Sequence, residues 1–117
     1  MILADTSVWI QHFRHGDPKL AEYLSQELVV MHPFIAGELA CGNLKNRVAI
    51  LRDLEALPAA TPVSDAEALR FLESRRLWGR GLGWIDVHLL ASAILSGCEL
   101  WTLDRRIEEA AREIGLK

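Results

Sequence analysis

The sequence predicts an α/β fold in which helices cover both faces of a parallel sheet. Short apolar runs without charge recur along the chain, and such runs are typical of strands buried on both faces. Segments with helical spacing and capping residues separate these runs. Strands separated by helices imply right-handed crossovers, which place the strands parallel in one sheet. The length of 117 residues, half of them hydrophobic, fits a single domain over residues 1–117.

The first half of the chain begins with an apolar strand that leads directly into a helix. Asp5, Thr6 and Ser7 follow this strand and can cap the helix. Asp17 is a good N-cap for the next helix, and Pro18 suits its first position. The expected strands lie at residues 1–4 and 28–31, and the expected helices at 8–13, 18–26, 33–40 and 44–55.

The second half repeats this alternation around one very apolar helix. Ser64 and Glu67 form a capping box, which marks a helix start. Residues 84–96 have almost no polar face, so this helix should be central and buried, and Gly97 should end it. The glycine-rich segment 79–83 is expected to be a mobile loop. The expected strands lie at 59–63 and 99–103, and the expected helices at 64–77, 84–96 and 105–114.

The charge distribution restricts the classes of partner. The net charge is −3, so no global positive field attracts nucleic acid or a membrane surface. Arg75, Arg76 and Arg80 form a local basic cluster that could grip RNA phosphates, or could simply be a solvated helix end. We expect no signal peptide and no membrane span, and hence a cytoplasmic protein with two free thiols, Cys41 and Cys98.

Four acidic residues occupy positions where solvated surface charges are not expected. Their own apolar segments contain no lysine or arginine, although Arg105 and Arg106 follow the last of them. A carboxylate among apolar neighbours is costly unless it is paired, protonated or bound to a metal. These residues, which we take as candidate catalytic and metal-binding groups, are Asp5, Glu38, Asp86 and Asp104.

The expected topology gives a reason for the four acids to meet. Asp5 and Asp104 end strands, where ligands of open parallel sheets bind. Asp86 lies in the first turn of the apolar helix, and Glu38 lies about one turn into its own helix. Such carboxylates repel one another, and a bound Mg²⁺ or Mn²⁺ would hold them together ionised. A site of this kind suits phosphodiester hydrolysis by a metal-oriented water.

Simpler structural interpretations remain open for each of these residues. Asp5 and Asp104 could act only as N-caps, Asp86 as a first-turn acid favoured by the helix dipole, and Glu38 as a solvated side chain. Ser7 and Thr102 lie two residues from an acid. Either hydroxyl could hydrogen-bond a carboxylate or a metal-bound water, or serve only in capping and strand packing.

Four segments of the chain form one recognisable set, and they are DTSVWI at 5–10, IAGEL at 35–39, GWIDVHLLASA at 83–93 and LWTLD at 100–104. Together these segments resemble a PIN domain, specifically a VapC-type toxin ribonuclease. The resemblance implies a metal-dependent endoribonuclease built as a three-layer α/β/α sandwich around a parallel sheet of four to five strands. It implies that the four acids hold Mg²⁺ or Mn²⁺, and it implies a homodimer, an RNA substrate and a VapB-like antitoxin. Relatives often continue into a last strand, which puts the fifth strand in doubt here.

Two other functional classes compete with a nuclease. A phosphoacceptor signalling domain would need an acceptor aspartate at a central strand end with a lysine nearby, and the third expected strand ends near Val63 and Ser64 instead. A catalytically silent binding module, whose acids bind a partner's arginines, is the second alternative.

Overall fold

A three-stranded parallel sheet lies at the centre of the computed structural model, which describes residues 1–116. β1 (Ile2–Ala4) is the middle strand, with β2 (Val29–Val30) on one side and β3 (Glu99–Trp101) on the other. Leu3 is fully buried, and it pairs with Val30 in β2 and with Leu100 in β3. Because both neighbours run parallel to β1, the carboxyl ends of the strands lie at one edge of the sheet.

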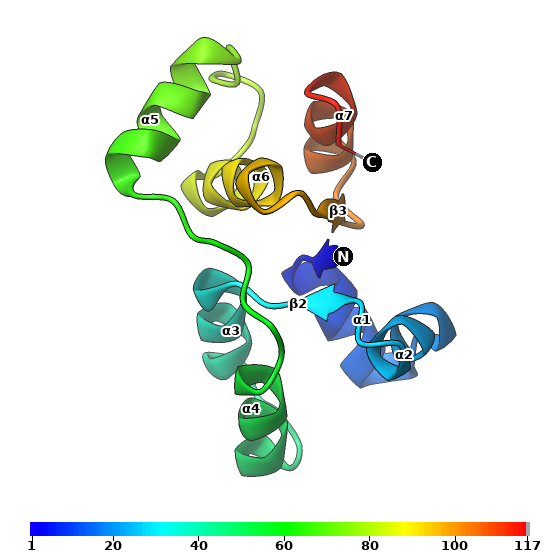
Figure 1. Ribbon diagram of the computed structural model, residues 1–117. Helices are drawn as coiled ribbons and strands as arrows, with labels where there is room; N and C mark the ends of the chain where they lie inside the picture. The colour runs from blue at the N-terminus through cyan, green and yellow to red at the C-terminus, as the bar shows by residue number, and fades with distance from the viewer. Residues whose placement is uncertain (117) are drawn as a thin grey trace.

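Helices surround this sheet, as expected for parallel strands joined by crossovers. Figure 1 shows α3 and α6 to the left of the strands, α2 to the right and α7 above them. The predicted α/β sandwich with a parallel sheet is therefore confirmed. The helices are α1 (Thr6–His15), α2 (Pro18–Ser25), α3 (Pro33–Ala40), α4 (Arg47–Glu55), α5 (Asp65–Ser74), α6 (Trp84–Ser96) and α7 (Arg105–Glu113).

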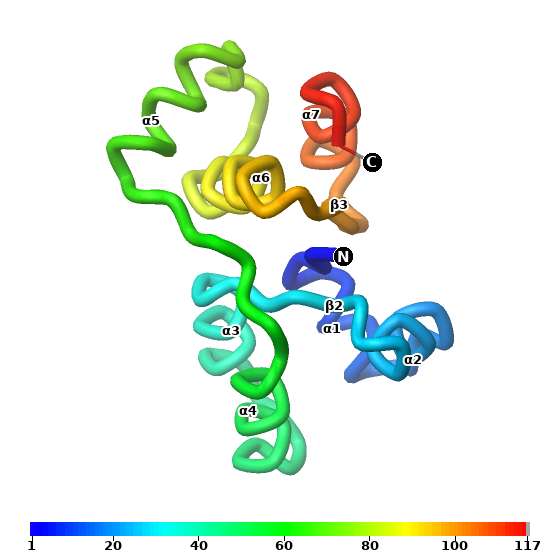
Figure 2. The backbone as a smooth tube through the Cα atoms, in the orientation of Figure 1, coloured from blue at the N-terminus to red at the C-terminus, as the bar shows by residue number. Residues whose placement is uncertain are grey.

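The number of strands was predicted wrongly, because residues 59–63 form no strand. This segment makes one isolated bridge, between Met31 and Ala59, and Figure 2 shows it as part of the extended connection from α4 to α5. The Thr61 amide donates to Ser96 Oγ at 2.8 Å, and Pro62 has no amide proton to donate. Hydrogen-bonded strand pairing therefore cannot continue beyond the bridge between Met31 and Ala59. The sheet in residues 1–116 has three strands in place of the expected four to five.

The chain after α7 ends in a helix cap within the described residues. Gly115 has φ +90°, its amide donates to Arg112 O, and the Leu116 amide donates to Ala111 O. This pair of bonds is the Schellman motif, which satisfies the last carbonyls of a helix. No fifth strand forms in residues 1–116, and Lys117 lies outside the described residues.

Two helices are shorter than predicted by more than one residue, because local turns delay the start of one and end the other early. α4 begins at Arg47 instead of residue 44, after Asn46 in the left-handed conformation. α5 ends at Ser74 instead of residue 77, because Arg76 has φ +54° and the Leu77 amide donates back to Leu72 O. This turn leads the chain into the glycine-rich loop before α6.

α6 packs most of its length inside the molecule, as its apolar sequence predicts. Seven consecutive residues of this helix, 87–93, are buried, and Leu90 and Ala93 have no exposed surface. α6 has 13 residues, and no helix in residues 1–116 has both the length and the apolarity that a membrane crossing needs. α6 contacts β3 and α5, which holds this helix against the sheet.

The backbone conformation at the end of α2 can be tested by substitution. Glu27 has φ +57° and the Leu28 amide donates to Tyr23 O, so residue 27 occupies the position that favours glycine. Glu27→Gly should stabilise the protein by about 0.5–1 kcal/mol. The matched change Glu22→Gly, inside α2, should instead destabilise it by about 1 kcal/mol. Denaturant unfolding measures both, and a loss of stability in Glu27→Gly would contradict the described turn.

Candidate active site

Asp5 is a buried carboxylate at the carboxyl end of β1. It is 5% exposed, and its amide donates to Trp101 O at 2.9 Å, which fixes it beside the end of β3. Oδ1 caps α1 by accepting from the Ser7 amide at 3.0 Å, and it also accepts from Ser7 Oγ at 2.5 Å. Oδ2 accepts from Thr102 Oγ1 at 2.5 Å. These hydrogen bonds offset the cost of burying the carboxylate and fix its orientation.

Ser7 and Thr102 join the ends of β1 and β3 through Asp5. Thr102 Oγ1 accepts from the Asp104 amide at 3.0 Å, and Ser7 Oγ accepts from the Leu103 amide at 3.1 Å. Of the alternatives left open by the sequence, the hydroxyl-to-carboxylate hydrogen bond is present for both residues. The geometry of Asp5 and the position of Asp104 are thus coupled.

Asp86 lies in the first turn of α6, where its Oδ2 accepts from the Gly83 amide at 2.8 Å. Burial raises the pKa of Asp86, the Gly83 hydrogen bond opposes that shift, and the negative charges of Asp104, Asp5 and Glu38 raise it further. Each of these three acids is therefore near enough to Asp86 to act on it electrostatically. The structure places the predicted residues in one neighbourhood, on four different elements.

Glu38 and Asp104 each have a polar partner at this edge. Glu38 Oε1 accepts from Thr6 Oγ1 at 2.8 Å, which connects α3 to the first turn of α1. Asp104 caps α7 and accepts from the Arg106 side chain, with Nη2 at 3.3 Å from Oδ2. The hydrogen bond from the Arg106 side chain is the main cause that holds the pKa of Asp104 below its usual value. An arginine thus already neutralises one member of the acidic group.

The sequence argument missed this role of Arg106. Its position two residues after Asp104 was the available signal, because a side chain there can fold back on the cap. Arg106 also packs against the glycine-rich loop: a Cβ added to Gly81 would lie 2.9 Å from its Nη1. Gly81 has φ +80° as well, so this contact depends on glycine for two reasons.

The four carboxylates do not form a ready-made ligand cage. No group of three His, Cys, Asp or Glu side chains within residues 1–116 is arranged to hold a metal ion. Both oxygens of Asp5 accept from hydroxyls, and both oxygens of Asp104 accept from Arg106. The donors themselves are carboxylate oxygens, the ligands that Mg²⁺ and Mn²⁺ prefer. The chemistry of the set fits such an ion, which would have to displace Arg106 and the hydroxyls from these oxygens.

The three arginines predicted to contact RNA each take part in the structure of the protein itself. Arg80 forms an ion pair with Glu113 at 2.5 Å, joining the glycine-rich loop to α7. Arg75 lies over the Phe71 ring at 5.7 Å, and Arg76 forms the turn after α5. Their contact with RNA stays a prediction.

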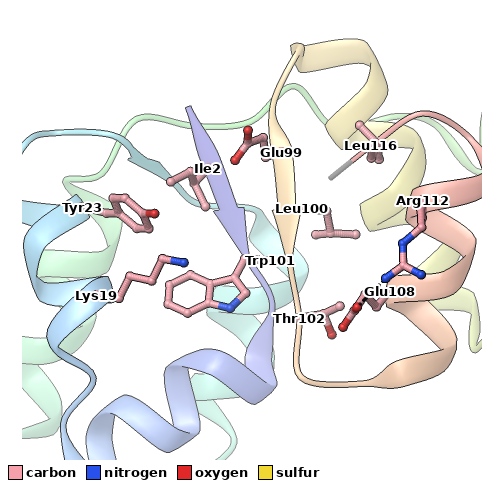
Figure 3. A pocket seen from close by; sticks show the side chains of 10 residues that line it. All are labelled: Ile2, Lys19, Tyr23, Glu99, Leu100, Trp101, Thr102, Glu108, Arg112 and Leu116. Carbon is pink, nitrogen blue, oxygen red and sulfur yellow. Dashed lines mark hydrogen bonds and ion pairs between the residues drawn. The ribbon is translucent and has the colours of Figure 1, made fainter.

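A cavity of about 390 Å³ lies alongside β3, between α2 and α7, and is separate from the four acids. Figure 3 shows Lys19, Tyr23 and Trp101 on one side of it and Arg112 on the other. The Lys19 ammonium lies 5.9 Å from the Tyr23 ring and 5.7 Å from the Trp101 ring. Thr102 is the one residue this cavity shares with the acidic network, so the cavity is not the candidate active site.

The raised pKa of Asp86 predicts a pH-dependent change in stability. Between the ordinary carboxyl pKa and the raised value, the folded state binds more protons than the unfolded state. Stability should therefore fall as the pH rises through this window. Asp86→Asn removes the buried charge and keeps an oxygen for the Gly83 amide, so it should raise the melting temperature at pH 7 in metal-free buffer.

This gain in Asp86→Asn should shrink near pH 3, where the wild-type carboxyl is protonated in both states. Asp17→Asn is the control, because asparagine is also a good N-cap and Asp17 caps α2 outside the acidic group. An equal gain at both pH values, or destabilisation at pH 7, would contradict the repulsion among the four acids.

Comparisons with known proteins agree with this architecture. The PIN domain family matches residues 2–113. Two proteins named Ribonuclease VapC32, from Mycobacterium tuberculosis strains CDC 1551 / Oshkosh and ATCC 25618 / H37Rv, are each 45% identical over 117 residues, which is 99% of this chain and 94% of each relative. The crystal structure of PAE2754 from Pyrobaculum aerophilum has a TM-score of 0.61 and 19% identity, over 93% of this chain and 84% of that one, which supports the fold alone. The chain belongs to the PIN-domain family and is a VapC-type member of it.

Proposed function

We propose that this protein is a metal-dependent endoribonuclease that hydrolyses RNA phosphodiester bonds as the toxin of a VapBC-type toxin–antitoxin pair. The observation that carries the proposal is that Asp104, Asp5 and Glu38 each lie near enough to the half-buried Asp86 to act on its carboxyl group electrostatically. They gather at the sheet edge where ligands of parallel α/β folds bind. The name Ribonuclease VapC32 of two relatives supports RNA as the substrate.

The four carboxylates would hold Mg²⁺ or Mn²⁺, which when bound supplies positive charge for the phosphate and lowers the pKa of a water. Asp5 is the most firmly oriented of them, since Ser7 and Thr102 hold both of its oxygens. The raised pKa of Asp86 reflects its burial and the negative charges of its neighbours, which the ion would offset.

In this proposal, Arg106 binds the Asp104 carboxylate when no metal is present and an RNA phosphate when the metal is bound. In the described state its guanidinium neutralises Asp104. A guanidinium presents a planar set of donors that also matches a phosphate group. When an ion occupies the carboxylates, Arg106 is free to turn to the RNA phosphate. Gly81 leaves the space in which this side chain lies.

The proposed partners are an RNA substrate, a VapB-like antitoxin and a second copy of this chain, and the proposed location is the cytoplasm. An antitoxin that presents an arginine to the acids would repeat the Arg106–Asp104 interaction and block the site. Large apolar side chains on the surface, such as Trp78, Val48 and Leu95, are available for contacts with protein partners. A catalytically silent binding module would use the same acids only to bind arginines of a partner.

RNA cleavage separates the nuclease from the silent module. Wild-type protein with Mg²⁺ should cut total cellular RNA at defined ends, and EDTA should stop the reaction. Asp5→Asn and Asp86→Asn should each reduce the rate by about 10²–10⁴-fold while the protein stays folded. Asp17→Asn provides the matched control and should cleave like wild type. Unchanged cleavage in both site variants would refute the assignment of these residues.

The toxin role has a separate readout in cells. Expression of the wild-type chain should halt growth, and co-expression of the antitoxin from the neighbouring reading frame should restore it. Growth arrest that persists in Asp86→Asn would show that the arrest does not come from the proposed nuclease site.

A further inference from the structure

Two histidines with unsatisfied ring nitrogens are buried where α3 meets α6. His32 is 1% exposed and His88 is 2% exposed. Within residues 1–116, His32 Nε2 and His88 Nδ1 are two of the three buried side-chain polar atoms that have no hydrogen-bond partner. Such atoms are rare, because burial removes their hydrogen bonds to water and each gains none in return. The proposed reaction uses neither ring.

His32 caps α3 with one ring nitrogen and keeps the other unsatisfied. Its Nδ1 accepts from the Phe34 amide at 3.0 Å, so Nδ1 carries no proton. Burial, and to a lesser degree the charge of His88, lowers the pKa of His32 to about 4. The neutral ring therefore carries its proton on Nε2, which makes the unsatisfied atom a donor. Asparagine or serine would cap the helix without a buried ring, so the cap alone does not account for a histidine.

His88 presents the complementary atom. Its Nε2 lies 3.0 Å from Oδ1 of Asp65 at the start of α5, and an ionised carboxylate only accepts hydrogen bonds. Nε2 therefore carries a proton, and in the neutral ring Nδ1 is left as an acceptor. The unsatisfied donor of His32 thus has a matching unsatisfied acceptor on His88.

Aromatic rings hold the two histidines in one cluster. The Phe34 ring of α3 lies 5.1 Å from the His32 ring and 4.9 Å from the His88 ring, centroid to centroid. Trp84, one turn earlier on α6, packs edge-on against His88 at 4.8 Å. Phe34 and Trp84 are themselves exposed, so they cover the histidines on the outside. The charge of His88 also acts on His32, so the two rings are close enough to interact.

Both helices of this cluster carry a proposed site residue. α3 runs from its His32 cap to Glu38 and beyond, and α6 carries Asp86 two residues before His88. Glu38 is one of the charges that raise the pKa of Asp86. A change in the distance or angle between α3 and α6 would therefore move these two carboxylates relative to each other.

We propose that one internal water links His32 Nε2 to His88 Nδ1, and that this linked pair positions Glu38 relative to Asp86. The water accepts a hydrogen bond from His32 and donates one to His88, which satisfies both nitrogens. Internal waters occupy such places between otherwise unsatisfied polar groups. His32 and His88 are thus positioning residues that touch neither the substrate nor the ion. The effect on metal binding rests on the proposed nuclease site, whereas the link itself does not.

NMR and crystallography test the link in the wild-type protein. Imidazole ¹⁵N shifts at pH 7 should show Nε2 protonated and Nδ1 unprotonated in both rings. A crystal structure should show one water within about 3 Å of both His32 Nε2 and His88 Nδ1. A proton on Nδ1 of either ring, or a crystal structure without this water, would overturn the link.

A double-mutant cycle tests whether the two rings act together. His32→Asn keeps a cap for α3 and removes the Nε2 donor, and His88→Gln keeps a donor for Asp65 and removes the Nδ1 acceptor. In denaturant unfolding without metal, the double variant should lose less stability than the two single losses added together. The coupling should be about tenfold in the unfolding equilibrium constant. Strictly additive losses would count against the link.

Titration calorimetry with Mn²⁺ separates positioning from a purely structural role. Each single variant, folded at the temperature used, should bind Mn²⁺ about tenfold more weakly, as is usual when a group that supports metal ligands is lost. His12→Asn is the matched control and should bind like wild type. Its Nδ1 likewise accepts a backbone amide, that of Asp17 at 3.0 Å, and it lies outside the acidic group.

Wild-type Mn²⁺ affinity in both His32→Asn and His88→Gln, or an equal loss in His12→Asn, would overturn the positioning role. A wild-type protein that binds no Mn²⁺ would refute the proposed metal site and the positioning role with it. The ring protonation, the water and the double-mutant cycle judge the link separately from that failure.

Discussion

The hydrogen-bonded carboxylate of Asp5 is the interaction on which the rest of the site depends. It lies buried between β1 and β3, where Ser7 and Thr102 each donate a hydroxyl proton to it at 2.5 Å. The same hydroxyls accept from the amides of Leu103 and Asp104, so the loop before α7 is attached to the loop before α1. Asp5 and Asp104, two of the proposed site residues, and the closure of the fold at this edge therefore use one hydrogen-bond network.

This network brings negative charges together at a cost in stability. The pKa of Asp86 is raised partly by Asp104, Asp5 and Glu38, which means that its ionised form is disfavoured. Helix N-termini, the Thr6 hydroxyl and the Arg106 guanidinium supply the compensation present in the chain. Each of these is a weaker neutraliser than a divalent ion. The arrangement is therefore tolerated without metal, and the proposed ion would offset the remaining repulsion.

Much of the fold, and the proximity of Asp5, Glu38 and Asp104 to Asp86, could be predicted from the sequence, because the relevant signals are local. Caps such as Asp17 and the Ser64–Glu67 box lie where they were expected, and apolar runs formed β1, β2 and β3. The strand at 59–63 failed because the partner of the Thr61 amide, Ser96, is 35 residues away. Tertiary contacts of this kind also decide the contact between Arg106 and Gly81. No sequence periodicity reports on them.

Metal binding by the isolated protein tests the central claim most directly. Titration calorimetry with Mn²⁺ should detect a site in wild-type protein, and Glu38→Gln should lose most of that binding because one carboxylate ligand is removed. Asp17→Asn, which keeps all four acids, should bind Mn²⁺ like wild type. Absence of Mn²⁺ binding in the wild type, or equal binding in Glu38→Gln, would contradict a single site built from these carboxylates.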